Sequence, residues 1–257
     1  MKTKLIILGC GSSLGVPKAD GNWGNCNPKE KKNYRTRCSA LIKSKYNNIL
    51  IDTSPDLRNQ LLKNNINKID HVIYSHKHGD QVHGINDLRV FALKKVKKIP
   101  VYADYETAKY IKSNFSYCFN DNYGYKAILN LNKIKKNFLF KNNKNFISIK
   151  SIPVQHGNIK SQSFIINNLC AYVSDGNKIY DKHLKFFNNL KYLVIDCLRF
   201  NKHPSHFNLE DVMKLTNVIK PKKTILTNLS ADMDYNYLLK ILPKNIIPAY
   251  DGMSFYI

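Results

Sequence analysis

Two imidazoles and a carboxylate alternate with other residues in the run Ser-His-Lys-His-Gly-Asp-Gln at 75–81. The preceding apolar stretch, 69–74, has the character of a β-strand. Side chains two residues apart on extended backbone point the same way, so His76 and His78 are expected to face one point. Gly79 permits a turn that brings Asp80 toward that point. Imidazole nitrogen and carboxylate oxygen bind zinc and similar metals, so the run predicts a metal site.

Other potential ligands follow apolar runs farther along the chain. His156 stands before a glycine after an expected strand, and Asp175 stands before a glycine after the run 171–174. Alone, His156 would be an ordinary loop histidine and Asp175 a turn residue. Asp52 and Asp196 also follow apolar runs, and we expect them to bond loop backbone.

These side chains must be positioned by a fold in which strands and helices interleave. Strands are expected at 4–8, 40–43, 49–51, 71–74, 101–102, 146–149, 163–166, 170–173, 192–195, 224–226 and 254–257. Helices are expected at 56–63, 106–117, 182–187, 209–220 and 234–241. This order predicts an α/β (α+β) protein with sheets of mixed strand direction. The segment 120–145 reads as a loop, and no linker interrupts the chain, so one domain over 1–257 is expected.

Composition sets limits on the class of protein. A hydrophobic content of 43% fits a soluble globular protein. No segment approaches the roughly 20 apolar residues of a membrane span, and the first apolar run is too short for a signal peptide, so we expect a cytoplasmic protein. The six cysteines are scattered without a CxxC pair and are expected to be reduced thiols.

The net charge of +23 has two interpretations. One is a nucleic-acid partner or a polyanionic substrate. The other, which we favour, is the compositional drift of an AT-rich genome, because lysine, asparagine, isoleucine and tyrosine are abundant together and the lysines are spread along the chain. Either way, a positive field favours a small anionic substrate.

The order HxHxD, a later strand-end histidine and a strand-end aspartate resembles the metallo-β-lactamase superfamily over nearly the whole chain. Further runs resemble the branch that contains the cyclic phosphodiesterase of phosphonate breakdown: 8–17, 51–58, 83–89, 173–175, 195–197 and 250–253. The resemblance implies a four-layer αβ/βα sandwich with metals at one edge between the sheets.

The resemblance also implies the ligands. His76, His78 and His156 match the first metal site. Asp80 and Asp175 match ligands of a second site, and Asp175 is the one that usually bridges.

Two positions depart from the family pattern. Gln81 and Asn228 stand where the family has histidines, and amide oxygens bind divalent metal more weakly than imidazole and suit Mn better than Zn. We therefore expect one firmly bound Zn or Mn and a second that is weak or absent. His83 is expected to point elsewhere. Only Cys26 remains where the phosphonate-pathway relative clusters the cysteines of a structural zinc, so that zinc is expected to be absent.

The implied chemistry is attack by a metal-bound hydroxide on a phosphodiester, because a zinc-class metal lowers the pKa of bound water from about 16 toward about 7. Asp80 would orient the water or accept its proton. His206, just before a predicted helix, resembles the family's general acid; the alternative is that it caps the helix or lies in solvent. His203 is its rival. Substrate phosphate has three candidate partners between which the sequence does not choose: Arg58, Arg89 and Arg199.

Three functions are compatible with these residues. The first is a metal-dependent phosphodiesterase acting on a small cyclic or nucleotide-like substrate. The second is a nuclease of the tRNA 3′-processing type, favoured by the charge but lacking a glycine/proline-rich insertion like that group's tRNA-binding arm. The third is a metal-binding or sensing protein without catalysis, favoured by Gln81 and Asn228. The sequence predicts no membrane partner and leaves a homodimer open.

Overall fold

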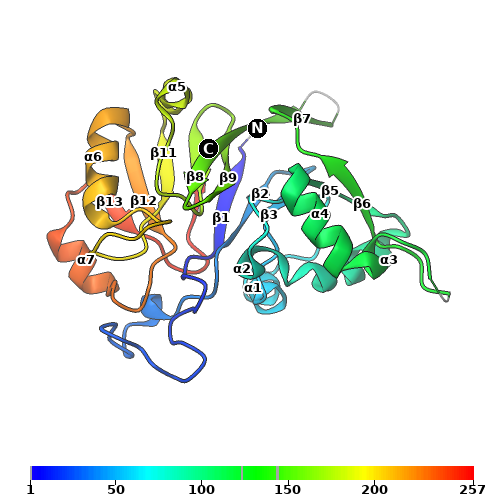
Figure 1. The fold of residues 1–257 in the computed structure, drawn as a ribbon, viewed down its shortest axis with the longest axis horizontal. Helices are drawn as coiled ribbons and strands as arrows, with labels where there is room; N and C mark the ends of the chain where they lie inside the picture. Colours follow the sequence, from blue (N-terminus) through cyan, green and yellow to red (C-terminus); the bar gives the residue numbers. More distant parts are fainter. Residues whose placement is uncertain (1, 123, 143–144) are drawn as a thin grey trace.

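The computed structural model describes residues 2–122, 124–142 and 145–257. Its strands form two seven-stranded sheets that pack face to face with helices on the outside (Figure 1). No helix in these ranges is both long and apolar enough to cross a membrane.

The first sheet has the order β14-β1-β2-β3-β4-β5-β6. Strands β3 to β6 run parallel to one another, and the pairs β14-β1, β1-β2 and β2-β3 are antiparallel. The bounds are β1 Lys4–Gly9, β2 Ser39–Lys43, β3 Asn48–Ile51, β4 His71–Ile73, β5 Ile99–Ala103, β6 Leu129–Lys133 and β14 Ser254–Tyr256.

The second sheet repeats this plan in the order β13-β12-β11-β10-β9-β8-β7. Strands β10 to β13 are parallel, and β7 to β10 pair antiparallel. The bounds are β7 Asn137–Asn142, β8 Asn145–His156, β9 Ile159–Ile166, β10 Cys170–Val173, β11 Tyr192–Asp196, β12 Lys223–Thr227 and β13 Ile246–Pro248.

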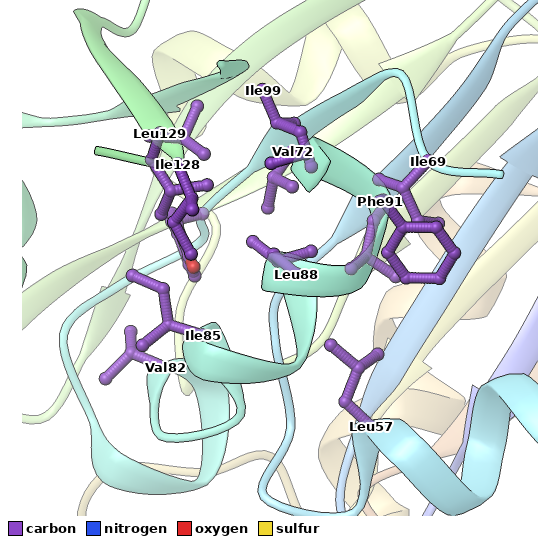
Figure 2. Packing of buried hydrophobic residues seen from close by; sticks show 14 of the residues in the cluster. Leu57, Ile69, Val72, Val82, Ile85, Leu88, Phe91, Ile99, Ile128 and Leu129 are labelled. Atoms are coloured by element: carbon purple, nitrogen blue, oxygen red, sulfur yellow. The ribbon is translucent and has the colours of Figure 1, made fainter. Parts of the chain in front are cut away.

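Three apolar clusters hold the layers together. One lies between the first sheet and its outer helices, where Leu57, Val72 and Leu88 are fully buried (Figure 2). These helices are α1 Leu57–Lys63, α2 Gly79–Val82, α3 Arg89–Lys95 and α4 Tyr105–Asn114. A second cluster fills the space between the sheets, and a third lies under α5 Asp181–Leu184, α6 Leu209–Ile219 and α7 Tyr235–Ile241. Four layers result, so the predicted αβ/βα sandwich is confirmed.

The helix boundaries follow from local chemistry. Asn208 caps α6 by accepting from the backbone N–H of Asp211 at 2.8 Å, and the Asp211 side chain bonds back to the cap, forming a capping box. Lys220 ends α6 in the left-handed conformation directly before Pro221. The predicted helix 209–220 therefore has its expected ends.

The loop prediction for 120–145 is wrong where this segment contains β6 and β7, while its residues 123 and 143–144 lie outside the described part of the chain. Asparagine and lysine dominate their composition and hide the strand signal. Pairing with neighbouring strands compensates for this low strand propensity. Strand β6 extends the parallel half of one sheet, and β7 pairs with β8 in the other, where Phe138 and Phe140 are buried between the layers.

The connection between β1 and β2, residues 10–38, is fixed by buried polar groups. Arg35 is 1% exposed and donates from its guanidinium to the carbonyl oxygens of Ser230 (3.2 Å) and Met233 (2.7 Å), to Asn33 Oδ1 (3.1 Å) and to Cys26 Sγ (3.8 Å). A guanidinium cation thus lies against the Cys26 thiol. All six cysteines are buried and unpaired.

Candidate metal centre and active site

Three histidines from two strand ends converge on one point between the sheets. His76 and His78 follow β4, and His156 ends β8. His76 Nε2 lies 3.0 Å and His156 Nε2 lies 3.2 Å from His78 Nδ1. Nitrogens bound to a tetrahedral zinc at about 2.0–2.1 Å stand about 3.3 Å apart, so this spacing fits a metal ion.

The surroundings hold these rings in a form that can bind metal. His156 Nδ1 donates to the Ser205 carbonyl oxygen at 2.7 Å, which leaves the lone pair of Nε2 directed at the other rings. Burial lowers the pKa of His76 to about 3, and burial likewise lowers the pKa values of His78 and His156. Neutral imidazole is the ligating form, so the three histidines suit a divalent cation.

A second group of side chains lies beside the histidines. Asp175, His156 and His206 place one ligand-type atom each within 4.8 Å of the others. Burial acts to raise the pKa of Asp175, but the surrounding histidines His76, His156 and His206, of which His206 is the one whose own pKa is raised, outweigh burial and lower that pKa.

Two amides satisfy the Asp175 carboxylate. Gln81 Nε2 donates to Asp175 Oδ2 at 3.2 Å and to Asp80 Oδ2 at 3.1 Å, while Asn228 Nδ2 donates to Asp175 Oδ1 at 3.1 Å. Burial and the neighbouring Asp175 raise the pKa of Asp80 to about 6. The amide groups of Gln81 and Asn228 therefore contact these carboxylates from the two positions where the family has histidines.

His206 is oriented by a buried carboxylate. Its Nδ1 donates to Asp196 Oδ2 at 2.7 Å, and Nε2 has no hydrogen-bond partner among the described residues. Burial acts to lower the pKa of His206, but the charge and hydrogen bond of Asp196, assisted by Asp175, raise it to about 9. The ring packs edge-on against His156, with centroids 4.7 Å apart. The side chain can therefore donate a proton beside the metal ligands.

A pocket of about 350 Å³ opens onto this cluster. His78, Asp80, Asp175, His206 and Asn228 line it, together with the rim residues Lys18, Arg199 and His203. Of the three candidate arginines only Arg199 lines this pocket; Arg58 and Arg89 line a different one. The structure thus brings all the predicted ligands and His206 together.

Other predicted positions take supporting places. His83 turns away and lies 3.1 Å from the Tyr110 hydroxyl, as expected. Asp52 accepts from the Ser75 backbone N–H at 2.7 Å, which fixes the start of the histidine run.

The sequence interpretation missed part of the role of Asp196. This residue does bond loop backbone, accepting from Gly176 N at 3.0 Å, but its contact with His206 was not anticipated. The available signal was its strand-end position in the parallel half of a sheet, the same position that Asp175 has.

Sequence comparisons match the chain to a family model and to a longer relative. Residues 47–227 match the family model of the beta-lactamase superfamily domain. An octanoyltransferase from Porphyromonas gingivalis is 30% identical over 256 residues; the match covers 98% of this chain, which spans about half (51%) of that relative's length.

Solved structures share the whole fold. A diphosphatase of the PhnP family has a TM-score of 0.90 and 27% identity, with 100% of this chain and 98% of that chain covered. The short form of human tRNase Z has a TM-score of 0.69 and 14% identity, with 98% of each chain covered, a similarity of fold alone.

Proposed function

The chain belongs to the beta-lactamase superfamily, and we propose that it is a metal-dependent hydrolase that cleaves a small cyclic or nucleotide-like phosphodiester. The observation that carries the proposal is the pairing of His206 Nδ1 with the buried Asp196 at 2.7 Å, beside the three-histidine cluster. Such a pairing leaves the opposite ring nitrogen to protonate a leaving alkoxide. Phosphodiester cleavage requires such a proton donor, whereas a protein that only binds metal does not.

His76, His78 and His156 would hold a divalent Zn or Mn ion. When bound, that ion supplies a nucleophilic water at neutral pH and neutralises charge on the phosphoryl oxygens. The distances between the three ring nitrogens and the neutral state of the rings support this assignment.

Two side chains move the protons. Asp80 lies at the pocket wall and accepts a proton from the attacking water as the new phosphorus–oxygen bond forms. His206 donates a proton to the leaving oxygen as the old phosphorus–oxygen bond breaks, and Asp196 holds its ring in place. Lys18 and Arg199 at the rim favour an anionic substrate.

The second metal position is the weaker one in this proposal. Both oxygens of Asp175 already accept amide N–H groups, from Gln81 and from Asn228. A cation bridging through Asp175 would have to displace these donors, and the amide oxygens that replace them are poorer ligands than imidazole. We infer one firmly bound ion and a second that is bound weakly or not at all.

Turnover by the metal-stripped and reloaded protein tests the activity. Bis-p-nitrophenyl phosphate, a 2′,3′-cyclic nucleotide and a ribosyl 1,2-cyclic phosphate are assayed with Zn²⁺ or Mn²⁺, and an octanoyl thioester is included because of the relative's name. Metal-stimulated phosphodiester turnover that His76→Ala abolishes is expected, with His83→Ala, at an exposed histidine that does not line the pocket, as the control. A metal-loaded protein without phosphodiester turnover would indicate sensing instead, and turnover of the thioester alone would indicate acyl chemistry.

The role of His206 has its own readout. His206→Gln should slow cleavage of esters with alkoxide leaving groups by about 100-fold or more, the usual range for a general acid. The loss should be much smaller for p-nitrophenolate, which leaves without protonation. An equal loss for both leaving groups would exclude His206 as the acid.

A further inference from the structure

Three aromatic rings stand in a row beside the second sheet. Tyr180, His183 and Phe186 lie three residues apart: Tyr180 directly precedes α5, His183 lies on α5, and Phe186 lies on the 3-10 turn Lys185–Phe187 that follows it. The ring centroids of Tyr180 and His183 are 5.7 Å apart, and those of His183 and Phe186 are 6.3 Å apart. All three side chains are half-buried, so each keeps part of its surface toward solvent.

Lysines surround the far end of this row. The ammonium groups of Lys136, Lys150 and Lys185 lie 5.8, 4.8 and 5.6 Å from the centre of the Phe186 ring. Lys135 and Lys182 join them around a groove of about 510 Å³ that His183 and Phe186 also line. No carboxylate lines this groove, and none of these lysines forms an ion pair within the described ranges.

The row leads from the basic groove toward the metal centre. Strand β8 lines the groove with residues 151–153 and ends at the ligand His156. At about 3.3 Å per residue, Pro153 lies about 10 Å from His156 along the strand. A second hollow, of about 690 Å³, is lined by Tyr180 and Lys160 and also by the candidate ligand His76. Two carboxylates, Asp104 and Glu106, also line this hollow; Glu106 is paired with Lys77 at 3.8 Å.

We propose that this ridge, defined by Tyr180, His183 and Phe186 with the lysines around them, binds single-stranded nucleic acid. Lysines that track phosphates and aromatic rings with surface open to solvent, on which bases stack, are the two components of such surfaces. An acidic peptide would use the lysines but would leave the rings without partners. The lysines come from three separate segments within residues 135–185, which explains why the sequence shows no basic stripe.

Binding is measured on metal-stripped protein, so its outcome is independent of the proposed hydrolysis. The probe is a fluorescent oligouridine of about 12 nucleotides, followed by anisotropy. Phosphate contacts from four of the five lysines predict that the Kd rises about 50-fold between about 50 and 200 mM salt. Lys182→Gln with Lys185→Gln should weaken binding and reduce that salt effect to about sevenfold.

Phe186 tests the stacking component. Phe186→Leu should weaken binding about tenfold, the scale of one stacked base, while Phe186→Tyr should retain it. The matched control is Lys240→Gln with Lys244→Gln, which makes the same charge change on and after α7. Oligothymidine distinguishes DNA from RNA, and binding of either polymer supports the ridge.

Three results would overturn the proposal. The first is an equal effect of the control pair, which would indicate attraction by net charge alone. The second is unchanged binding by Phe186→Leu. The third is competition by polyglutamate as strong as competition by unlabelled oligouridine, which would indicate an acidic protein partner.

Discussion

Replacing Arg35 by methionine should strongly destabilise this protein, although the residue is not a candidate ligand or catalytic group. Arg35 is almost fully buried, and no carboxylate is among its hydrogen-bond partners. Its guanidinium satisfies the carbonyl oxygens of Ser230 and Met233, in the segment that follows β12 and lines the active-site pocket. Methionine retains most of the apolar stem but supplies no donor.

The expected loss follows from the groups left unsatisfied. The Met233 carbonyl oxygen has no other donor among the described residues, and a buried acceptor left without a donor costs about 1–3 kcal/mol. The Ser230 carbonyl oxygen keeps the Met233 N–H (3.2 Å) and Asn33 Oδ1 keeps the Tyr235 N–H (2.8 Å), so each loses one bond at about 0.5–1.5 kcal/mol, and the total predicted loss is about 3 kcal/mol. At about 2–4 °C per kcal/mol for a chain of this size, the Tm should fall by about 10 °C. Because the same segment carries pocket residues, KM should also rise.

Urea unfolding followed by circular dichroism measures the free energy, and a thermal melt checks it. The matched control is Arg37→Met. The ion pair of Arg37 with Asp56 leaves these side chains 30% and 20% exposed, so its loss should cost only about 1 kcal/mol. The reasoning is refuted if Arg35→Met costs no more than Arg37→Met, because the buried carbonyls would then have found other partners.

Three further outcomes are expected. Burial lowers the pKa of His71 to about 4, so between pH 4 and 6.5 the folded state binds fewer protons than the unfolded state. The protein therefore loses stability as the pH falls through that window. His71→Phe should remove about 2 kcal/mol of this acid destabilisation at pH 5, measured by urea unfolding at pH 5 and 7.5. Gln81→His with Asn228→His should add a second metal ion per chain by elemental analysis, with spin coupling between the two Mn²⁺ ions in EPR; unchanged metal content would contradict our explanation of the weak site. Asp196→Asn should lower kcat about 100-fold or more with little change in KM, because His206 loses its orienting carboxylate, and an effect confined to KM would speak against that role.

The convergence of the candidate ligands could be predicted because strand ends are local signals. His76, His78 and His156 each follow an apolar run, and the alternation of a strand fixes their direction. The sandwich itself followed from family resemblance together with interleaved elements. Individual strands such as β6 were missed because pairing with β5, not their own composition, makes them strands.

The polar network around these ligands could not be predicted in the same way. Asp196 and His206 are close in sequence, but the loop between them decides whether they meet. Arg35 contacts carbonyl groups almost 200 residues away, and nothing in its neighbourhood of the sequence indicates burial. Such contacts depend on packing between distant segments rather than on local pattern.

The pairing of β14 with β1 means that one wall of the pocket is fixed only after residues far along the chain have been synthesised. Asp251, just before β14, accepts from the backbone N–H groups of Cys10 (3.1 Å) and Thr36 (2.8 Å), at the two ends of the connection whose residues 12–14 line the pocket. A contact across 241 residues cannot form while residue 251 is still inside the ribosome. Residues 12–14 of the pocket wall are therefore synthesised before the contact that fixes them, and a nascent chain carries its candidate metal ligands before this pocket wall is fixed.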